Sequence, residues 1–147
     1  MTEDERLLHA AIALSRRAPR SYTAFSVGCI IAESETQVIA TGFSRERDAD
    51  SHAEQVAIEK VLELQANLSR ATLYTSMEPC SMRRSGLHPC AARIIEAGIG
   101  RVVFAMREPP VFVEGHGADV LAGAGIDVIE IASEAPLVAR INAHVLE

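Results

Sequence analysis

Four side chains in this sequence have the types and the spacing of a hydrolytic metal site. His52 and Glu54 are two residues apart, and Cys80 and Cys90 each follow a proline. One imidazole and two thiolates supply the three protein ligands that a catalytic Zn²⁺ ion needs, because such an ion keeps its fourth position open. Glu54 then remains as a free carboxylate that can move protons to and from a water molecule at that position.

The order of these residues is typical of zinc sites at which water replaces an amino group. Such sites combine H-x-E with a later P-C and a second cysteine, and the glutamate serves as general acid and base. The three motifs occur here at residues 52–54, 79–80 and 89–90. One feature departs from the pattern: nine residues separate Cys80 from Cys90, where two are usual.

Neighbouring residues leave other interpretations open. A closed structural zinc site needs a fourth protein ligand; His88 lies in the same loop and could supply it, with Glu54 then acting as a helix cap in a non-catalytic binding domain. Cys29 lies within an apolar run and is expected to pack in the core. Arg83 and Arg84 are expected to be solvated, although their place between the cysteines would also suit a contact with a substrate phosphate.

Length and composition indicate a single globular domain over residues 1–147, with 48% hydrophobic residues. The net charge of −6 argues against nucleic acid as a partner and favours a small-molecule substrate. No apolar run reaches the roughly 18 residues of a membrane span, and the acidic opening at 1–5 is unlike a signal peptide. We therefore expect a cytoplasmic protein, in which cysteines are more often metal ligands than disulfides.

Hydrophobic periodicity predicts the elements that would position the site. Strand and helix alternate in the later half of the chain, which is typical of a sheet with parallel neighbours and helices on its faces, so we expect a three-layer α/β/α sandwich. His52 and Cys90 would both lie at helix starts, where the partial positive charge favours a thiolate. The predicted helices cover 2–18 (ended by Pro19), 51–65, 90–97, 117–124 and 134–146, and the predicted strands cover 27–32, 38–43, 71–76, 101–106 and 126–131.

At these motifs the chain resembles the cytidine-deaminase superfamily and, more closely, the pyrimidine deaminase domain of riboflavin biosynthesis. The long gap between the cysteines is characteristic of this branch, although the present loop is one residue longer. The resemblance runs from about Leu7 to Ile131. The matching stretches are 52–58, 73–81, 89–90, 94–99, 101–107 and 124–128.

The resemblance implies a fold, a cofactor and an activity. The fold would be the α/β/α sandwich around a mixed five-stranded sheet. One Zn²⁺ per chain would be held by His52, Cys80 and Cys90, and Glu54 would be the proton shuttle. Because related deaminases self-associate, we also expect a homodimer or a larger homo-oligomer.

The positions that would hold the substrate differ from those of the riboflavin-pathway enzymes. The family's Ser-Asn-Pro before the first strand is replaced at 23–26, its basic loop before the second cysteine at 84–89, and its Asp-Pro-Asn-Pro at 108–111. The chain also ends before a reductase domain could begin. We therefore expect a stand-alone hydrolytic deaminase for another aminated pyrimidine, triazine, purine or pterin-like ring, with the riboflavin intermediate as the alternative.

Several residues bordering these segments are predicted to face the substrate. Phe25 could stack on a flat ring, or it could be part of the core. Backbone carbonyls near the Pro-Cys turn could accept a hydrogen bond from the substrate amino group. The six candidates are Phe25, Arg45, Ser76, Glu78, His88 and Glu108.

Overall fold

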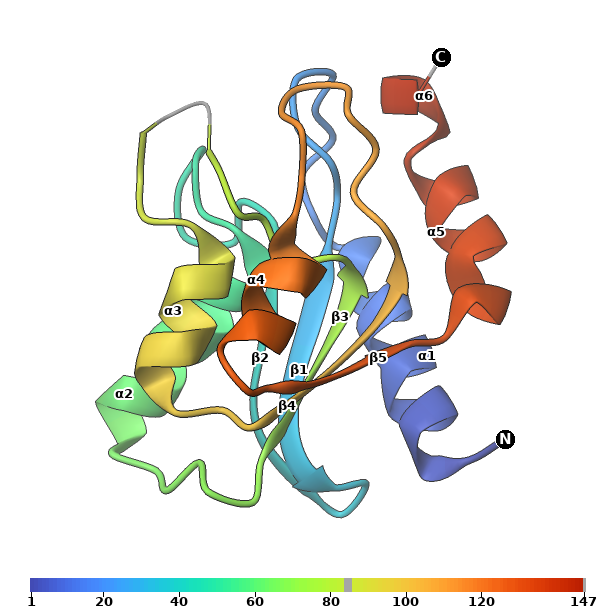
Figure 1. The fold of residues 1–147 in the computed structure, drawn as a ribbon. Coiled ribbons are helices and arrows are strands. Elements are labelled where there is room, and N and C mark those ends of the chain that lie inside the picture. The colour runs from blue at the N-terminus through green and yellow to red at the C-terminus, as the bar shows by residue number, and fades with distance from the viewer. Residues whose placement is uncertain (84–85, 147) are drawn as a thin grey trace.

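A computed structural model describes residues 1–83 and 86–146, and in it a twisted sheet lies between two layers of helices (Figure 1). Its strands are β1 (Gly28–Ser34), β2 (Gln37–Phe43), β3 (Thr72–Met77), β4 (Arg101–Met106) and β5 (Asp127–Glu130). Its helices are α1 (Glu3–Ser15), α2 (Ala53–Leu64), α3 (Cys90–Ala97), α4 (Gly117–Gly123), α5 (Ala135–Ile141) and α6 (Ala143–Leu146), with a 3₁₀ turn at Ala132–Glu134.

The strands form one mixed sheet in the order β2-β1-β3-β4-β5. β1 runs antiparallel to both β2 and β3, whereas β3, β4 and β5 are parallel to one another. The three-layer sandwich with a mixed five-stranded sheet is thereby confirmed. Because β3 and β4 are parallel, the segments that follow Met77 and Met106 leave the sheet at the same edge.

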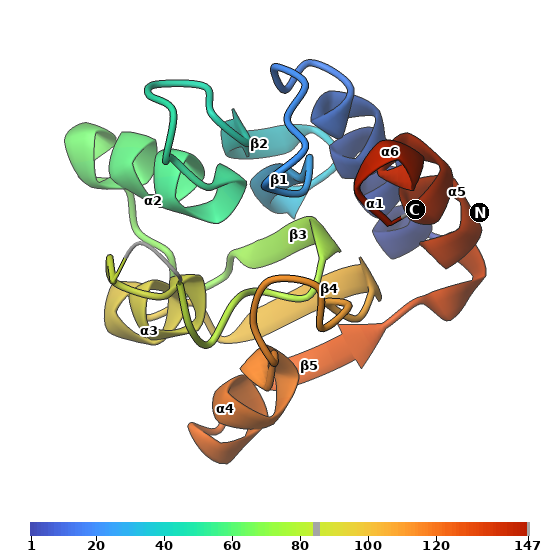
Figure 2. The same cartoon turned by 90° about the horizontal axis from the view of Figure 1, so that it is seen from above.

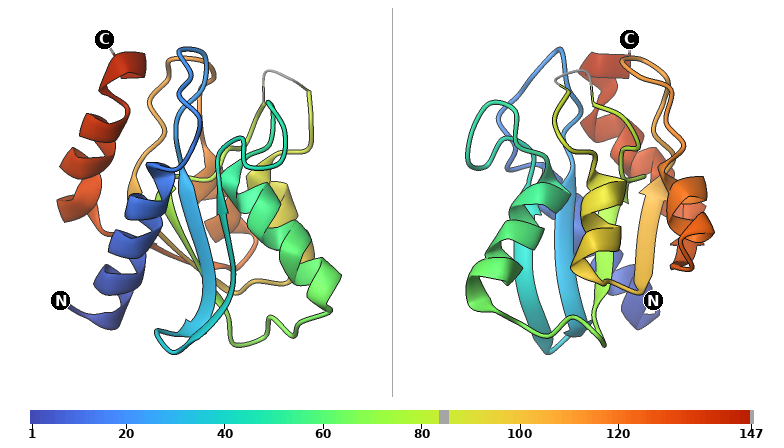
Figure 3. Two further views of the ribbon diagram at one scale, coloured as in Figure 1. Left: turned by 180° about the vertical axis from the view of Figure 1, so that it is seen from behind. Right: turned by 60° about the vertical axis from the view of Figure 1, so that its left-hand side comes forward.

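Each face of the sheet carries its own hydrophobic core. Seen from above, α2, α3 and α4 cover one face, while α1, α5 and α6 lie together on the other (Figure 2). Figure 3 shows the two helical layers from behind and, in a second view, with α2 and α3 in front of the sheet. The first core includes Ile31, Ala57, Val61, Leu73, Ile94 and Val102, and the second includes Leu8, Ile12, Ile30, Tyr74, Val103 and Val138.

Two glycines allow helices to lie unusually close to the sheet. A Cβ atom on Gly28 would lie 2.0 Å from the Ala11 carbonyl oxygen of α1. A Cβ atom on Gly42 would lie 2.3 Å from the carbonyl oxygen of Ala53, the first residue of α2. Since real Cβ contacts are essentially never this short, Gly42 sets how closely the start of α2 approaches β2.

The first helix ends earlier than the sequence predicts. Thr2 and Glu5 form a capping box, which fixes its start. The helix stops at Ser15, four residues before Pro19, and tight turns follow it. The Ser15 hydroxyl donates to the Ile12 carbonyl at 2.5 Å, and this kind of local bond competes with the regular helical pattern.

The single final helix predicted over 134–146 is wrong in one respect, because it is interrupted at Asn142 between α5 and α6. The Asn142 side chain donates to the Val138 carbonyl at 3.1 Å and also reaches a distant loop. None of the helices in the described part of the chain has the length and hydropathy needed to cross a membrane.

Candidate active site

Two helix starts and the end of a central strand bring three metal-binding side chains together. His52 is the N-cap of α2, Cys90 is the first residue of α3, and Cys80 follows β3. The His52 Nδ1 atom lies 3.6 Å from the Cys80 Sγ atom and 3.5 Å from the Cys90 Sγ atom. All three donor atoms lie within 4.8 Å of one another. The convergence predicted from the two helix starts is therefore present.

This donor set fits a tetrahedral zinc ion. With Zn–S near 2.3 Å and Zn–N near 2.05 Å, tetrahedral angles place a nitrogen and a sulfur ligand roughly 3.5 Å apart, close to the observed separations. Cys80 and Cys90 are free thiols rather than a disulfide. The hydrogen bond between the two thiols lowers the pKa of Cys80 and raises the pKa of Cys90, so Cys80 is the thiol that more readily forms the metal-binding thiolate.

Glu54 lies beside the three donors but is not one of them. It is only 4% exposed, and its Oε1 atom accepts a hydrogen bond from the Thr75 hydroxyl of β3 at 3.2 Å. Burial, and then the nearby Cys80 thiolate, raise the pKa of Glu54. A buried carboxylate that holds protons more readily than usual is suited to move them during a reaction.

Arg83 was expected to be solvated, but the structure shows that it is buried. Its guanidinium donates to the Gln55 side chain at 2.9 Å and to the Asp50 carbonyl at 2.5 Å. Gln55 also accepts the His52 backbone N–H at 3.3 Å. Arg83 therefore ties the segment that follows Cys80 to the start of α2. The corresponding expectation for Arg84 lies outside the described residues.

Glu78 joins the Pro-Cys turn to two other elements. Its carboxylate accepts the backbone N–H of Glu108 at 3.0 Å and that of Ala118 in α4 at 2.9 Å. A Cβ atom on Gly117 would lie 1.6 Å from the Pro79 carbonyl oxygen, so only glycine permits this contact. The Glu78 side chain thus fixes the walls of the site.

A cavity of about 190 Å³ opens over His52, Cys80 and Glu54. It is smaller than the roughly 300–1,000 Å³ of sites for drug-sized ligands, which favours a small ring. Phe25 and Phe112 line it in an edge-to-face pair with ring centroids 5.2 Å apart. Glu108 lines it as well, and burial followed by the nearby Cys80 raises the pKa of Glu108 to about 8.

Comparison with known proteins identifies the family. The sequence profile described as "Cytidine and deoxycytidylate deaminase zinc-binding region" matches residues 1–106.

The chain belongs to this family.

It is 37% identical over 128 residues to the diaminohydroxyphosphoribosylamino-pyrimidine deaminase of Schizosaccharomyces pombe, a match that covers 86% of this chain and 31% of that protein. It is 31% identical over 144 residues to a probable cytosine deaminase of the same yeast, covering 88% of this chain and 82% of that protein.

A solved structure with the same fold is that of the Thermotoga maritima diaminohydroxyphosphoribosylaminopyrimidine deaminase/5-amino-6-(5-phosphoribosylamino)uracil reductase. It superposes with a TM-score of 0.85 at 30% identity, over 98% of this chain and 40% of that one. The chain spans about a third of the length of the riboflavin-pathway relatives that it matches. The zinc-binding description of the family and the His52-Cys80-Cys90 group both point to zinc.

The other residues predicted to face the substrate fall into two groups. Phe25, Glu78 and Glu108 line the cavity, as does Arg45, but the Arg45 guanidinium is held by the carbonyls of Pro19 and Phe25. Ser76 and His88 are not among the residues that line the cavity.

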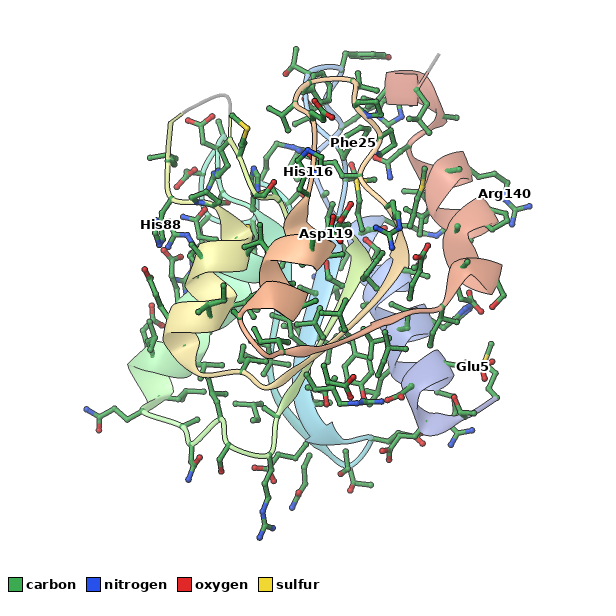
Figure 4. All side chains as sticks on the ribbon, in the orientation of Figure 1. Glu5, Phe25, His88, His116, Asp119 and Arg140 are labelled. Carbon is green, nitrogen blue, oxygen red and sulfur yellow. The ribbon has the colours of Figure 1, made fainter. Side chains whose placement is uncertain are left out.

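These two side chains have other partners. The Ser76 hydroxyl accepts the Gly28 N–H at 3.1 Å inside the sheet. The His88 imidazole lies 2.9 Å from the Glu96 carboxylate on the outer side of α3, away from Phe25 (Figure 4). His88 is not part of the donor group either, so a closed zinc site with His88 as its fourth ligand finds no support.

The motifs in the sequence do not predict two residues of the site, Phe112 and Thr75. Phe112 lies in a segment without motif or periodicity, and only its closeness to Glu108 in the sequence hints at a place near the cavity. Thr75 could have been found by alternation along β3. Its neighbour Tyr74 packs in the core beneath α1, so Thr75 points to the opposite face, where α2 begins.

Proposed function

We propose that this chain is a zinc-dependent hydrolytic deaminase that removes an exocyclic amino group from a small aminated heterocycle. The observation that carries the proposal is the position of Glu54, a buried carboxylate beside a His-Cys-Cys donor group at the floor of a small cavity. A closed structural site has no use for a free carboxylate at this place, whereas hydrolysis of a C–N bond needs a group that accepts and returns protons.

His52, Cys80 and Cys90 would hold the ion. A bound zinc ion would supply a water molecule activated for nucleophilic attack at neutral pH. The Thr75 hydroxyl donates to Oε1 of Glu54 and would hold the carboxylate in one orientation beside the donor group. Glu54 accepts one proton from the attacking water and delivers it to the ring nitrogen. It then accepts the remaining proton of the added hydroxyl and delivers it to the departing amine. Water adds to the ring carbon, the C–N bond breaks, and ammonia leaves while a carbonyl remains.

The cavity supports a flat, small substrate. Phe25 and Phe112 offer two aromatic surfaces against which a heterocycle can pack and exclude water. The Glu108 carboxyl group, which has no hydrogen-bond partner among the described residues, is available to the polar edge of the ring. We assign Phe25, Phe112 and Glu108 to substrate binding on these grounds.

A diaminohydroxyphosphoribosylaminopyrimidine is the second candidate substrate, because the S. pombe relative with 37% identity is named for its deamination. The altered positions 23–26 and 108–111 argue for a different ring. Both candidates share the same chemistry at Glu54 and differ in what the cavity walls must recognise.

Ammonia release tests the proposal. The zinc-loaded chain is incubated with cytosine, guanine, an aminotriazine and a pterin, with cytidine and its monophosphate, and with the diaminohydroxyphosphoribosylaminopyrimidine. We expect release from at least one compound. Glu54→Gln should keep its zinc and lose about 10²–10⁴-fold in kcat. Full activity of zinc-loaded Glu54→Gln would refute the role of Glu54 in proton transfer. Absence of ammonia release from every compound would refute the deaminase activity.

The expected homodimer stays a prediction, which light scattering on the purified chain tests. The acidic balance, with a net charge of −6, continues to favour a small molecule over nucleic acid. A cytoplasmic location is likewise an expectation from the sequence.

A further inference from the structure

The break between α5 and α6 places a buried amide against the loop that forms one wall of the cavity. The Asn142 side chain is fully buried. Its Oδ1 atom accepts the Ser26 backbone N–H at 2.7 Å, and its Nδ2 atom donates to the Ser26 carbonyl at 3.2 Å. One amide therefore satisfies both backbone groups of a residue 116 positions away in the sequence.

Arg45 holds the same loop from the other side. Its guanidinium donates to the Phe25 carbonyl at 3.1 Å and to the Ser26 hydroxyl at 3.2 Å, and it binds the Pro19 carbonyl as well. Arg45 adopts a left-handed backbone conformation, with φ of 59°, that an arginine rarely takes unless its surroundings impose it. The loop from 19 to 27 is therefore clamped between a side chain of the C-terminal segment and a side chain that follows β2.

Part of the clamped loop forms a wall of the cavity. Thr23, Ala24 and Phe25 all line the cavity, and Phe25 packs against Phe112 there. A second contact from the C-terminal segment reaches the loop, because the Tyr22 and His144 rings meet edge to face with centroids 5.4 Å apart. Figure 1 shows α5 and α6 standing beside the loops that border this end of the sheet.

We propose that Asn142 is a positioning residue that sets substrate affinity by fixing Phe25 through Ser26. This inference rests on the proposed deaminase function for its kinetic part. Asn142 itself is not among the residues that line the cavity or the metal group, so it acts on the wall and leaves the proton-transfer residue Glu54 and the zinc ligands in place.

The test uses the full zinc-loaded chain and three variants. Asn142→Ala removes all contacts of the amide, and the nearly isosteric Asn142→Asp keeps the acceptor for the Ser26 N–H while losing the donor. Asn67→Ala is the matched control, because the Asn67 side chain accepts only the local Ser69 N–H, far from the cavity wall in sequence. Since the chain contains no tryptophan, Phe25→Trp supplies a single fluorescent reporter in each background.

For Asn142→Ala we expect KM to rise about tenfold or more while kcat stays within about threefold of the parent, with an unchanged zinc content. In the Phe25→Trp background the indole emission should shift to the red. Amide exchange in 19–27 should accelerate, and Asn142→Asp should fall between the parent and Asn142→Ala. If Asn142→Ala fails to fold, the same comparison is made with Asn142→Asp.

The proposal is overturned if Asn142→Asp matches Asn67→Ala in KM, emission and exchange, or if kcat and zinc content fall together as KM rises. A parent chain that releases no ammonia refutes the deaminase function and the kinetic part of the inference together. Emission and exchange then still decide, independently, whether Asn142 positions Phe25.

Discussion

The Thr75 hydroxyl donates a hydrogen bond to Oε1 of Glu54 at 3.2 Å, in a place where Thr75 is fully buried. The two residues belong to different elements, the third strand and the second helix, so this bond fixes a helical side chain relative to the sheet. We propose that this bond orients the Glu54 carboxylate for the proton transfers, and this role can be tested directly.

Thr75→Val should lower kcat about tenfold, which corresponds to about 1.4 kcal/mol and is close to the lower end of the roughly 1.5–3 kcal/mol range for a hydrogen bond to a charged group. Thr75→Ser keeps the hydroxyl and should retain most of the activity. Steady-state kinetics of the two variants on the best compound of the panel provides the measurement. Equal kcat for valine and serine at this position would show that the bond does not orient Glu54.

The zinc content of cysteine variants should distinguish the proposed ligands Cys80 and Cys90 from Cys29. Cys80→Ala and Cys90→Ala should reduce the zinc-to-protein ratio from one to below about 0.1, because two remaining donors hold the ion poorly. Cys29→Ala is the matched control: burial raises the pKa of the Cys29 thiol well above its usual value, and its side chain packs in the core. Metal analysis after dialysis decides, and loss of zinc from Cys29→Ala would contradict the assignment.

Gly42→Ala should disturb the site from a distance. The added methyl group would meet the Ala53 carbonyl, so the start of α2 must move, and His52 moves with it. We expect about 1–3 kcal/mol of destabilisation together with weaker zinc binding. Gly100→Ala is the control, since no atom lies within 4 Å of its added carbon. Denaturant titration with metal analysis measures both effects, and similar behaviour of the two variants would argue against the close approach.

The first helix is tied to the sheet by a pH-dependent contact. Asp4 accepts from Arg101 at 2.9 Å and from the Tyr74 hydroxyl at 2.7 Å, and the Arg101 bond holds the pKa of Asp4 below its usual value. A carboxyl whose pKa is lower in the folded state than the roughly 3.9 of the unfolded state stabilises above that value. This stability is lost as the pH falls through the folded-state pKa.

Asp4→Asn should therefore destabilise the protein by about 1 kcal/mol at pH 7 and by less near pH 3, where part of this contribution is already lost. Denaturant midpoints at the two pH values measure the difference. Glu35→Gln, which removes the exposed partner of Arg6, should have a smaller effect at pH 7. A cost of Asp4→Asn that is equal at both pH values would refute the linkage.

The metal site could be predicted from the sequence because its chemistry restricts the residue types. Only a few side chains bind zinc, and helix starts are visible as capping residues and prolines, so His52 and Cys90 could be placed at converging helices before the fold was known. The three layers could be predicted from the alternation of strand and helix periodicity, whereas the mixed five-stranded sheet was implied by the resemblance to the deaminases.

The rest depended on contacts between distant segments. Arg83 is buried because Gln55 and the Asp50 carbonyl lie where its guanidinium ends, and no local pattern shows this. The interruption at Asn142 arises from its bonds to Ser26, whereas helical periodicity alone favours one continuous helix. The position of His88 between the two cysteines in the sequence predicts a place in the site, but its imidazole lies against the Glu96 carboxylate.

The side chains that would hold the ion lie at two helix starts and after a strand end, whereas the two rings and the acid proposed to contact the substrate come from the loops at 23–25 and 108–113. On this proposal, substrate selectivity and reactivity depend on separate segments of the chain. Exchanging those two loops with a relative should redirect the enzyme to another ring while its hydrolytic apparatus stays untouched.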